Sequence, residues 1–71
     1  MREVIITQDY IELYKVLKFE GLCASGGEAK SVISERLVQV NGTVETLKRK
    51  KLVSGDTILF NDTELHISSQ P

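Results

Sequence analysis

Residues 21–56 of the chain read GLCASGGEAKSVISERLVQVNGTVETLKRKKLVSGD. Within this stretch, Ser25 and Glu28 have the spacing of a capping box, which predicts that a helix begins there. Asn41-Gly42 is typical of a tight turn between two strands, and four consecutive cations follow at Lys48–Lys51. A helix, a strand, a tight turn and a basic loop in this order predict a small scaffold that holds one positive loop against an anionic partner.

The length and composition indicate one small domain. The 71 residues are 41% hydrophobic and 27% charged, which is typical of a single globular domain, and we expect it to span residues 1–71. A chain of this size buries only about 60% of the surface that it exposes when unfolded. Few residues are then left to line a deep pocket, so we expect no enzyme activity, no small-molecule substrate and no cofactor.

Apolar runs and cysteine content predict the cellular environment. The longest apolar runs, residues 4–6 and 58–60, are far shorter than the roughly 20 residues of a membrane-spanning helix. The first residues do not resemble a secretory signal. Cys23 is the only cysteine and cannot form an intramolecular disulfide, so we expect a cytoplasmic protein with Cys23 as a small buried residue.

The single histidine gives no support for catalysis or for a metal site. His66 alternates with Leu65 and Ile67, so it should face solvent from a strand that buries its two neighbours. No second histidine and no cysteine pair accompanies it, although zinc sites are built from such groups. We therefore expect neither a catalytic residue nor a metal ligand here.

Charge is unevenly distributed along the chain, although the net charge is only −1. Residues 15–51 contain eight cations and four acids, whereas the flanking segments contain one cation and six acids. Because exposed charges are screened beyond about 8 Å at physiological ionic strength, a partner responds to the local charge rather than to the sum. A basic binding face is therefore compatible with an acidic protein.

Periodicity predicts the elements that surround this stretch. Residues 4–7 are expected to form an opening strand. Asp9 and Glu12 have capping-box spacing, which predicts a first helix from about Tyr10 that ends at Gly21 in a left-handed conformation. Only about four residues then separate this helix from the second, so the two should pack directly against each other.

The second half of the chain is predicted to be mainly strand. The second helix should bury one face, formed by Ala29, Val32, Ile33 and Leu37. Strands are expected at residues 37–40, 57–60 and 64–68, with turns at Asn41-Gly42, Ser54-Gly55 and Asn61-Asp62. At Asn41-Gly42 we favour a three-residue bulged turn that pairs Val38 with Val44, because a strict two-residue turn would set Gln39 against Val44.

The cationic residues admit two interpretations. Grouping Lys48, Arg49, Lys50 and Lys51 creates repulsion and adds nothing to a core, which favours an anionic partner, although such runs are often only solvated surface. The helix lysines Lys15, Lys18 and Lys30 either extend the basic surface or merely aid solubility. Gly26-Gly27 either serves tight helix geometry or allows RNA to approach the backbone closely, and Ser25 is best explained as a helix cap.

Several segments together resemble a known family. They are Leu13–Gly21, Ala24-Ser25, Glu28–Lys30, Val38–Gly42 and Val53–Asp56. This combined pattern resembles the RNA-binding domain first described in ribosomal protein S-four, also called the alpha-L motif. Ser25-Gly26-Gly27 and the basic stretch are most similar to the small stand-alone bacterial members, and the resemblance covers about residues 10–60.

The resemblance implies an α+β fold with two packed helices against a small, mostly antiparallel sheet of about four to five short strands. It also implies that structured RNA binds along the helix pair and the basic loop. Carried over residue by residue, the implied RNA-binding residues are Lys15, Lys18, Ser25, Gly26, Lys30, Asn41, Lys48, Arg49, Lys50 and Lys51.

The chain departs from this family at the start of the second helix. Many members have arginines at the positions of Gly26 and Gly27, and here Glu28 and Glu35 lie on the same helix. This difference shifts the expected binding toward the basic loop. We expect little stacking on single strands, because the four aromatic residues mostly fall at core positions in the pattern: Tyr10, Tyr14, Phe19 and Phe60.

The resemblance implies that the partner is structured RNA, which could be ribosomal RNA, an assembling ribosomal subunit or transfer RNA. We also expect the protein to be a monomer. The larger relatives join this domain to a catalytic domain, whereas we expect a stand-alone domain here. The alternative is a protein-interaction module that docks an acidic protein through the same basic loop.

Overall fold

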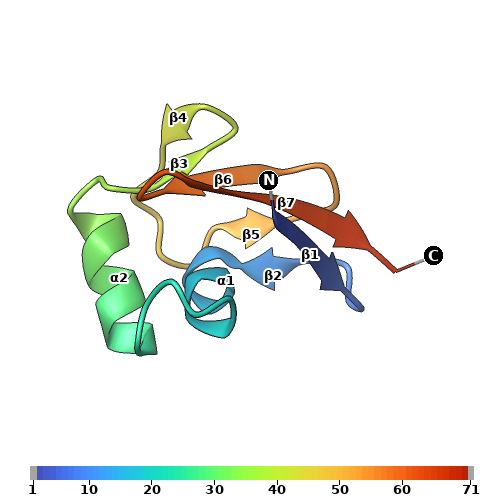
Figure 1. The fold of residues 1–71 in the computed structure, drawn as a ribbon, viewed down its shortest axis with the longest axis horizontal. Helices are drawn as coiled ribbons and strands as arrows, with labels where there is room; N and C mark the ends of the chain where they lie inside the picture. The colour runs from blue at the N-terminus through green and yellow to red at the C-terminus, as the bar shows by residue number, and fades with distance from the viewer. Residues whose placement is uncertain (1, 71) are drawn as a thin grey trace.

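A mixed five-stranded sheet lies over two short helices in the computed structural model, which describes residues 2–70 (Figure 1). The strand order of this sheet is β1-β7-β6-β3-β4, and a separate two-stranded sheet joins β2 to β5. The elements are β1 (Arg2–Ile6), β2 (Ile11–Glu12), α1 (Leu13–Phe19), α2 (Gly26–Ser34), β3 (Gln39–Val40), β4 (Thr43–Val44), β5 (Lys51–Leu52), β6 (Thr57–Phe60) and β7 (Thr63–Ser69).

The large sheet buries one face. β1 runs parallel to β7, whereas the β7–β6, β6–β3 and β3–β4 pairs are antiparallel. Because side chains alternate between the two faces of a strand, every second residue of the longer strands is buried, and these residues are Val4, Ile6, Ile58, Phe60, Leu65 and Ile67. This arrangement confirms the predicted α+β class and the inward positions of Leu65 and Ile67.

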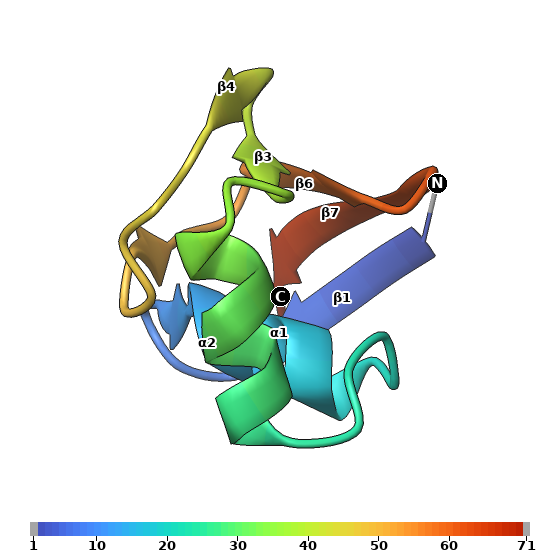
Figure 2. The same cartoon turned by 90° about the vertical axis from the view of Figure 1, so that its left-hand side faces the viewer.

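The two helices cover the buried face of the sheet and pack against each other, and they lie on the same side of the sheet (Figure 2). Leu13, Val16 and Leu17 of α1 are fully buried, in the i, i+3, i+4 spacing of an amphipathic helix. Gly21 follows α1 with φ 76°, which confirms the predicted left-handed cap. Within residues 2–70, neither helix has the length or the apolar character needed to cross a membrane.

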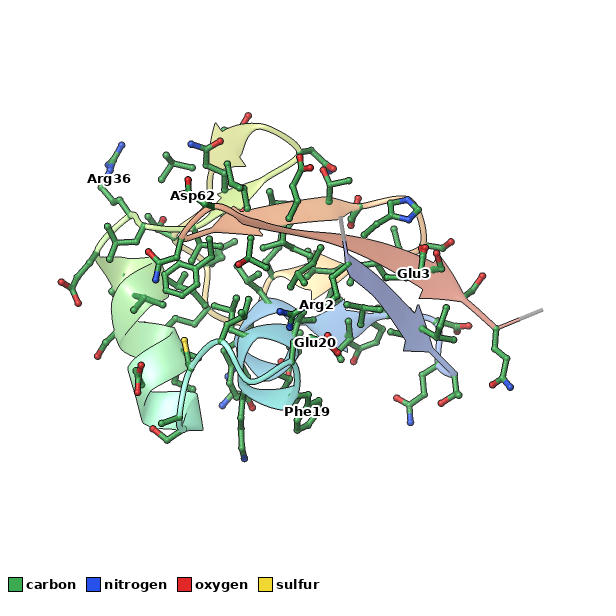
Figure 3. The ribbon with its side chains drawn as sticks, viewed as in Figure 1. Arg2, Glu3, Phe19, Glu20, Arg36 and Asp62 are labelled. Atoms are coloured by element: carbon green, nitrogen blue, oxygen red, sulfur yellow. The ribbon has the colours of Figure 1, made fainter. Side chains whose placement is uncertain are left out.

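The first strand is also tied to the end of α1. The Arg2 guanidinium donates a hydrogen bond of 2.8 Å to the carbonyl oxygen of Glu20 and lies 3.7 Å from the Glu20 carboxylate. Figure 3 shows these two side chains pointing toward each other between the sheet and the helix layer. This contact joins the two layers at the surface.

The predicted start of the first helix is wrong. Ile11 and Glu12 form strand β2, which pairs with β5 in the register Ile11↔Leu52, and α1 begins only at Leu13. Glu12 is the N-cap residue, and its side chain makes no capping hydrogen bond. The Asp9–Glu12 capping box fails because pairing with the distant β5 strand holds this segment extended.

The predicted end of the second helix is also wrong. α2 ends at Ser34, and Arg36 adopts the left-handed conformation with φ 66°. The amides of Arg36 and Leu37 donate to the carbonyls of Ile33 and Val32, which is the Schellman pattern. This reversal turns Leu37 out of the helix, so Leu37 is 54% exposed instead of buried, and the next strand is shortened to residues 39–40.

The bulged turn predicted at Asn41-Gly42 is wrong as well. The register is Val40↔Thr43 and Gln39↔Val44, so the turn has two residues, and Asn41 and Gly42 both have positive φ, 52° and 83°. A turn with two such residues matches the right-handed twist of the flanking strands. Val44 lies on the exposed edge strand β4, so pairing it with the polar Gln39 costs little free energy.

Candidate nucleic-acid interface

The backbone of the basic loop caps the start of α1. The amide of Leu13 donates to the carbonyl of Lys50 at 2.9 Å, and the amide of Tyr14 donates to the carbonyl of Lys48 at 3.1 Å. The first amides of a helix lack partners within the helix, and here the loop supplies them. The loop is therefore fixed against α1 rather than projecting freely.

The four consecutive cations are divided between this loop and a strand. Lys48 and Arg49 lie at the centre of a turn that a hydrogen bond from the Lys50 amide to the Leu47 carbonyl closes at 3.2 Å. Lys51 belongs to β5 and pairs with Glu12 of β2. The predicted loop thus contains Lys48 to Lys50, and the fourth cation is held by strand pairing.

Three cations from three separate segments converge on the ring of Tyr14. Lys30 Nζ of α2 lies 4.7 Å from the ring centroid, Arg49 Cζ of the loop 5.5 Å, and Lys15 Nζ of α1 6.0 Å. Cations are attracted to an aromatic face within about 6 Å of its centroid. We call Lys15, Lys30 and Arg49, together with Tyr14, the basic cluster.

One acidic side chain holds part of the basic cluster in place. The two carboxylate oxygens of Glu12 lie 3.2 Å from Lys15 Nζ and 3.6 Å from Arg49 Nη1. The three positive charges of the basic cluster and the one negative charge of Glu12 sum to a local charge of +2. Glu12 therefore reduces the repulsion between Lys15 and Arg49 while the site stays positive.

The start of α2 lies beside the same ring. A Cβ atom added at Gly26 would be 3.8 Å from two atoms of the Tyr14 ring, so residue 26 faces the basic cluster. Ser25 Oγ accepts a hydrogen bond from the Glu28 amide at 3.1 Å, and Glu28 Oε2 accepts one from the Ala24 amide at 3.2 Å. This confirms the predicted Ser25 cap, whereas Glu28 reaches back to the amide of Ala24 instead of to that of the N-cap residue Ser25. The Ser25 side chain is thus engaged within the protein.

Two further predicted cations lie over other aromatic rings. Lys51 Nζ is 4.9 Å from the ring centroid of Tyr10, and Lys18 Nζ is 5.9 Å from that of Phe19. Tyr10 and Phe19 are 42% and 64% exposed, and only Phe60 among the four aromatic residues is buried. The prediction that the aromatic residues mostly occupy the core is therefore wrong.

Asn41 lies apart from the basic cluster. Its side-chain oxygen accepts hydrogen bonds from the amide and hydroxyl of Thr57, and its side-chain nitrogen donates to Asp56. The β3–β4 turn that contains Asn41 lies on the opposite side of the molecule from the helices (Figure 1). The structure thus gives Asn41 a role in fixing this turn to β6.

Tyr14 and Glu12 are the two members of the site that the sequence analysis missed. Both lie next to the buried stripe of α1, and their partners Lys30 and Arg49 are distant in sequence. A half-buried tyrosine at the edge of such a stripe is only a weak indication of a binding site, because its ring can pack against the core while its hydroxyl group contacts water.

Cys23 and the contact between Glu3 and His66 lie outside the basic cluster. Burial, and to a lesser extent the charge of Glu28, raises the pKa of the Cys23 thiol, which keeps it protonated at neutral pH. His66 Nδ1 lies 2.9 Å from Glu3 Oε1, and Ser68 Oγ donates to that oxygen at 2.8 Å. Within residues 2–70, no group of three or more His, Cys, Asp or Glu side chains could hold a metal ion.

This fold and this basic surface define the class of protein. The model of the family described as S4 domain matches residues 4–68, so the chain belongs to that family, as its resemblance to the alpha-L motif predicted.

The relatives with which the chain aligns are bacterial. YbcJ of Escherichia coli (strain K12) and YbcJ of Shigella flexneri are each 49% identical to it over 51 residues, which is 72% of this chain and 73% of each relative. The solution structure of YbcJ from E. coli, described as revealing an alpha-L motif involved in RNA binding, matches with a TM-score of 0.73 and 38% identity. That match covers 96% of this chain and 87% of the other.

Proposed function

We propose that this chain is a non-catalytic RNA-binding module that grips the backbone of structured RNA with the basic cluster. The observation that supports this most strongly is the convergence of Lys15, Lys30 and Arg49 on one tyrosine ring. Membership of the S4 domain family and the description of the alpha-L motif in YbcJ as involved in RNA binding support the same function.

The arrangement suits a phosphate backbone. Three cations from α1, α2 and the loop are held together although they repel one another, and Lys48 and Lys50 flank Arg49 on the same loop. The groove of a folded RNA that carries base information is narrow and deep, so side chains mainly contact its backbone and shape. A rigid set of cations therefore recognises the path of the phosphates rather than the base sequence.

The number of phosphate contacts can be measured from salt dependence. Each neutralised phosphate contributes a slope of about 0.7 to 0.9 to the plot of log affinity against log salt. About four contacts by the basic cluster and its neighbouring lysines give a slope near −3. Because all of these cations come from one chain, we expect a monomer to bind.

The decisive experiment compares charge-neutralised variants with a matched control. Lys30→Gln and Arg49→Gln should each weaken binding to a folded ribosomal RNA fragment and make the salt slope shallower by about 0.7 to 0.9. Arg36→Gln removes the same charge at the other end of α2, about 13 Å along the helix from the Gly26 end, and should leave the slope unchanged.

Two results would contradict the proposal. One is equal weakening by all three variants, because a general charge effect would then explain binding. The other is no binding to folded RNA at low salt together with capture of an acidic protein, which would favour the alternative of a protein-interaction module. Crosslinking in cells with sequencing of the attached RNA tests whether ribosomal RNA or an assembling subunit is the target.

A further inference from the structure

A groove opens beside the basic cluster, between the segment that follows β1 and the first helix. Its volume of about 370 Å³ is within the range of small-molecule sites. Apolar and charged side chains both contribute to its lining, which includes Ile5, Tyr10, Ile11, Glu12, Lys15 and Phe19.

Two aromatic side chains of this groove remain exposed to solvent. They are Tyr10 and Phe19, the two exposed rings described above. Ile5 alternates with the buried Val4 and Ile6, so its side chain faces the other side of the sheet. The Phe19 side chain points away from the body of the molecule (Figure 3). Exposed aromatic rings that border a groove can contact a ligand, because each ring presents an apolar face to whatever enters.

Cations accompany every exposed ring of the groove. Lys51 lies over Tyr10, Lys18 lies over Phe19, and Lys15 lines the groove while also belonging to the basic cluster. A purely apolar ligand would not use these cations, and the backbone of a duplex would not use the rings. A nucleotide uses both, because its base stacks on an aromatic ring and its phosphate meets a lysine.

We propose that this groove binds an unpaired nucleobase of the same RNA whose backbone lies on the basic cluster. The proposal rests on the proposed RNA-binding function and refines its ligand. Lys15 joins the two surfaces, since it lies over the Tyr14 ring of the basic cluster and also lines the groove together with its ion-pair partner Glu12. The preferred ligand is then an RNA in which a paired stem meets a single strand, because paired and stacked bases cannot enter the groove.

The test uses two RNAs with the same stem, one blunt and one with a short unpaired extension. The native protein should bind the extended RNA more tightly, with an advantage on the order of tenfold for one stacked base. Phe19→Ala should remove this advantage and leave the affinity for the blunt stem unchanged. Phe19 is the last residue of α1 and largely exposed, so this substitution leaves the core intact.

Leu37→Ala is the matched control, because Leu37 is an exposed apolar residue outside the groove. It should preserve the advantage of the extended RNA. Ultraviolet crosslinking of the extension, followed by mass spectrometry, should attach the base to Tyr10 or Phe19.

The possible failures are distinguishable. Equal affinity of the native protein for both RNAs, or an advantage that survives in Phe19→Ala, overturns the groove proposal alone. No binding to either RNA at low salt overturns the proposed function and the groove proposal together.

Discussion

The amide of Tyr14 donates a hydrogen bond of 3.1 Å to the carbonyl of Lys48. Together with the bond from the Leu13 amide to the Lys50 carbonyl, it fixes the basic loop to the first turn of α1, directly beside the ring on which the cations converge. Because the loop carbonyls cap the helix amides, the same contact both stabilises α1 and positions Arg49. The basic surface is thus part of the fold and not an appendage to it.

Tyr14→Leu should weaken RNA binding by about tenfold. Leucine keeps apolar volume and helix propensity but removes the aromatic face, and each cation–π contact at an exposed site contributes about 0.5–1 kcal/mol. Tyr14→Phe keeps the face and should bind like the native protein. Measuring the Kd of both variants by fluorescence anisotropy checks this, and native affinity in Tyr14→Leu would show that the ring does not organise the cations.

Gly26→Arg should increase RNA affinity. A side chain at this position begins 3.8 Å from the Tyr14 ring, so the new guanidinium joins the basic cluster. The salt slope should steepen by about 0.7 to 0.9 for one added phosphate contact. Thr43→Arg adds the same charge on the exposed β4 strand and serves as the control; a similar gain there would argue for non-specific attraction.

Ser25→Ala should destabilise the fold by about 1 kcal/mol, because the Glu28 amide loses its capping acceptor. In a domain of this size that loss lowers Tm by about 4–8 °C. RNA affinity measured well below Tm should stay unchanged, since the hydroxyl is occupied within the protein. Thermal unfolding with and without RNA separates the two effects, and a loss of affinity without a loss of Tm would make Ser25 an RNA contact.

Arg36→Gly should stabilise the protein by roughly 0.5–1 kcal/mol. Arg36 has φ 66°, and a left-handed conformation costs a non-glycine residue about 1–2 kcal/mol, partly offset by the greater freedom of glycine in the unfolded chain. Arg36→Ala retains the Cβ atom and should bring no such gain. Urea unfolding of the two variants distinguishes relief of backbone strain from removal of the charge.

Stability should also depend on pH through the contact between β1 and β7. The hydrogen bonds from His66 and then Ser68 lower the pKa of Glu3 below its ordinary value of 4.5. A carboxyl group with a lowered pKa in the folded state stabilises the protein at pH values above its pKa in the unfolded chain. This stabilisation is lost as the pH falls through the pKa of the folded state.

Glu3→Gln should therefore lower Tm slightly at pH 7 and have little effect at pH 3. Circular dichroism melts at both values provide the measurement, with Glu64→Gln on β7 as a control. An equal shift at both pH values would show that the ionised carboxylate contributes nothing.

Local signals in the sequence predicted the parts of the fold that depend on near neighbours. The helix cap by Ser25, the left-handed Gly21 and the alternation of Leu65 and Ile67 each involve residues a few positions apart, and all three are confirmed. The predicted boundaries of helices and strands were wrong where contacts between distant segments determine the local structure. β2 exists because Ile11 pairs with Leu52, and no local pattern near Ile11 reveals that partner.

The sequence predicted the cations of the candidate site but not how they are arranged in space. Lys15, Lys30 and Arg49 were all identified from the sequence, whereas the ring that gathers them and the carboxylate of Glu12 that bridges two of them depend on tertiary contacts. Asn41 fitted the family pattern, yet its carboxamide is committed to Asp56 and Thr57.

The most direct test of the central claim is the mapping of backbone amide chemical shifts by NMR during titration with a folded RNA. The account predicts that the largest changes cluster at residues 12–15, 26–30 and 48–51, with little change at the β3–β4 turn around Asn41 or at Arg36. Changes centred instead on the solvent-facing side of the large sheet, around Glu3, Leu59 and His66, would contradict it.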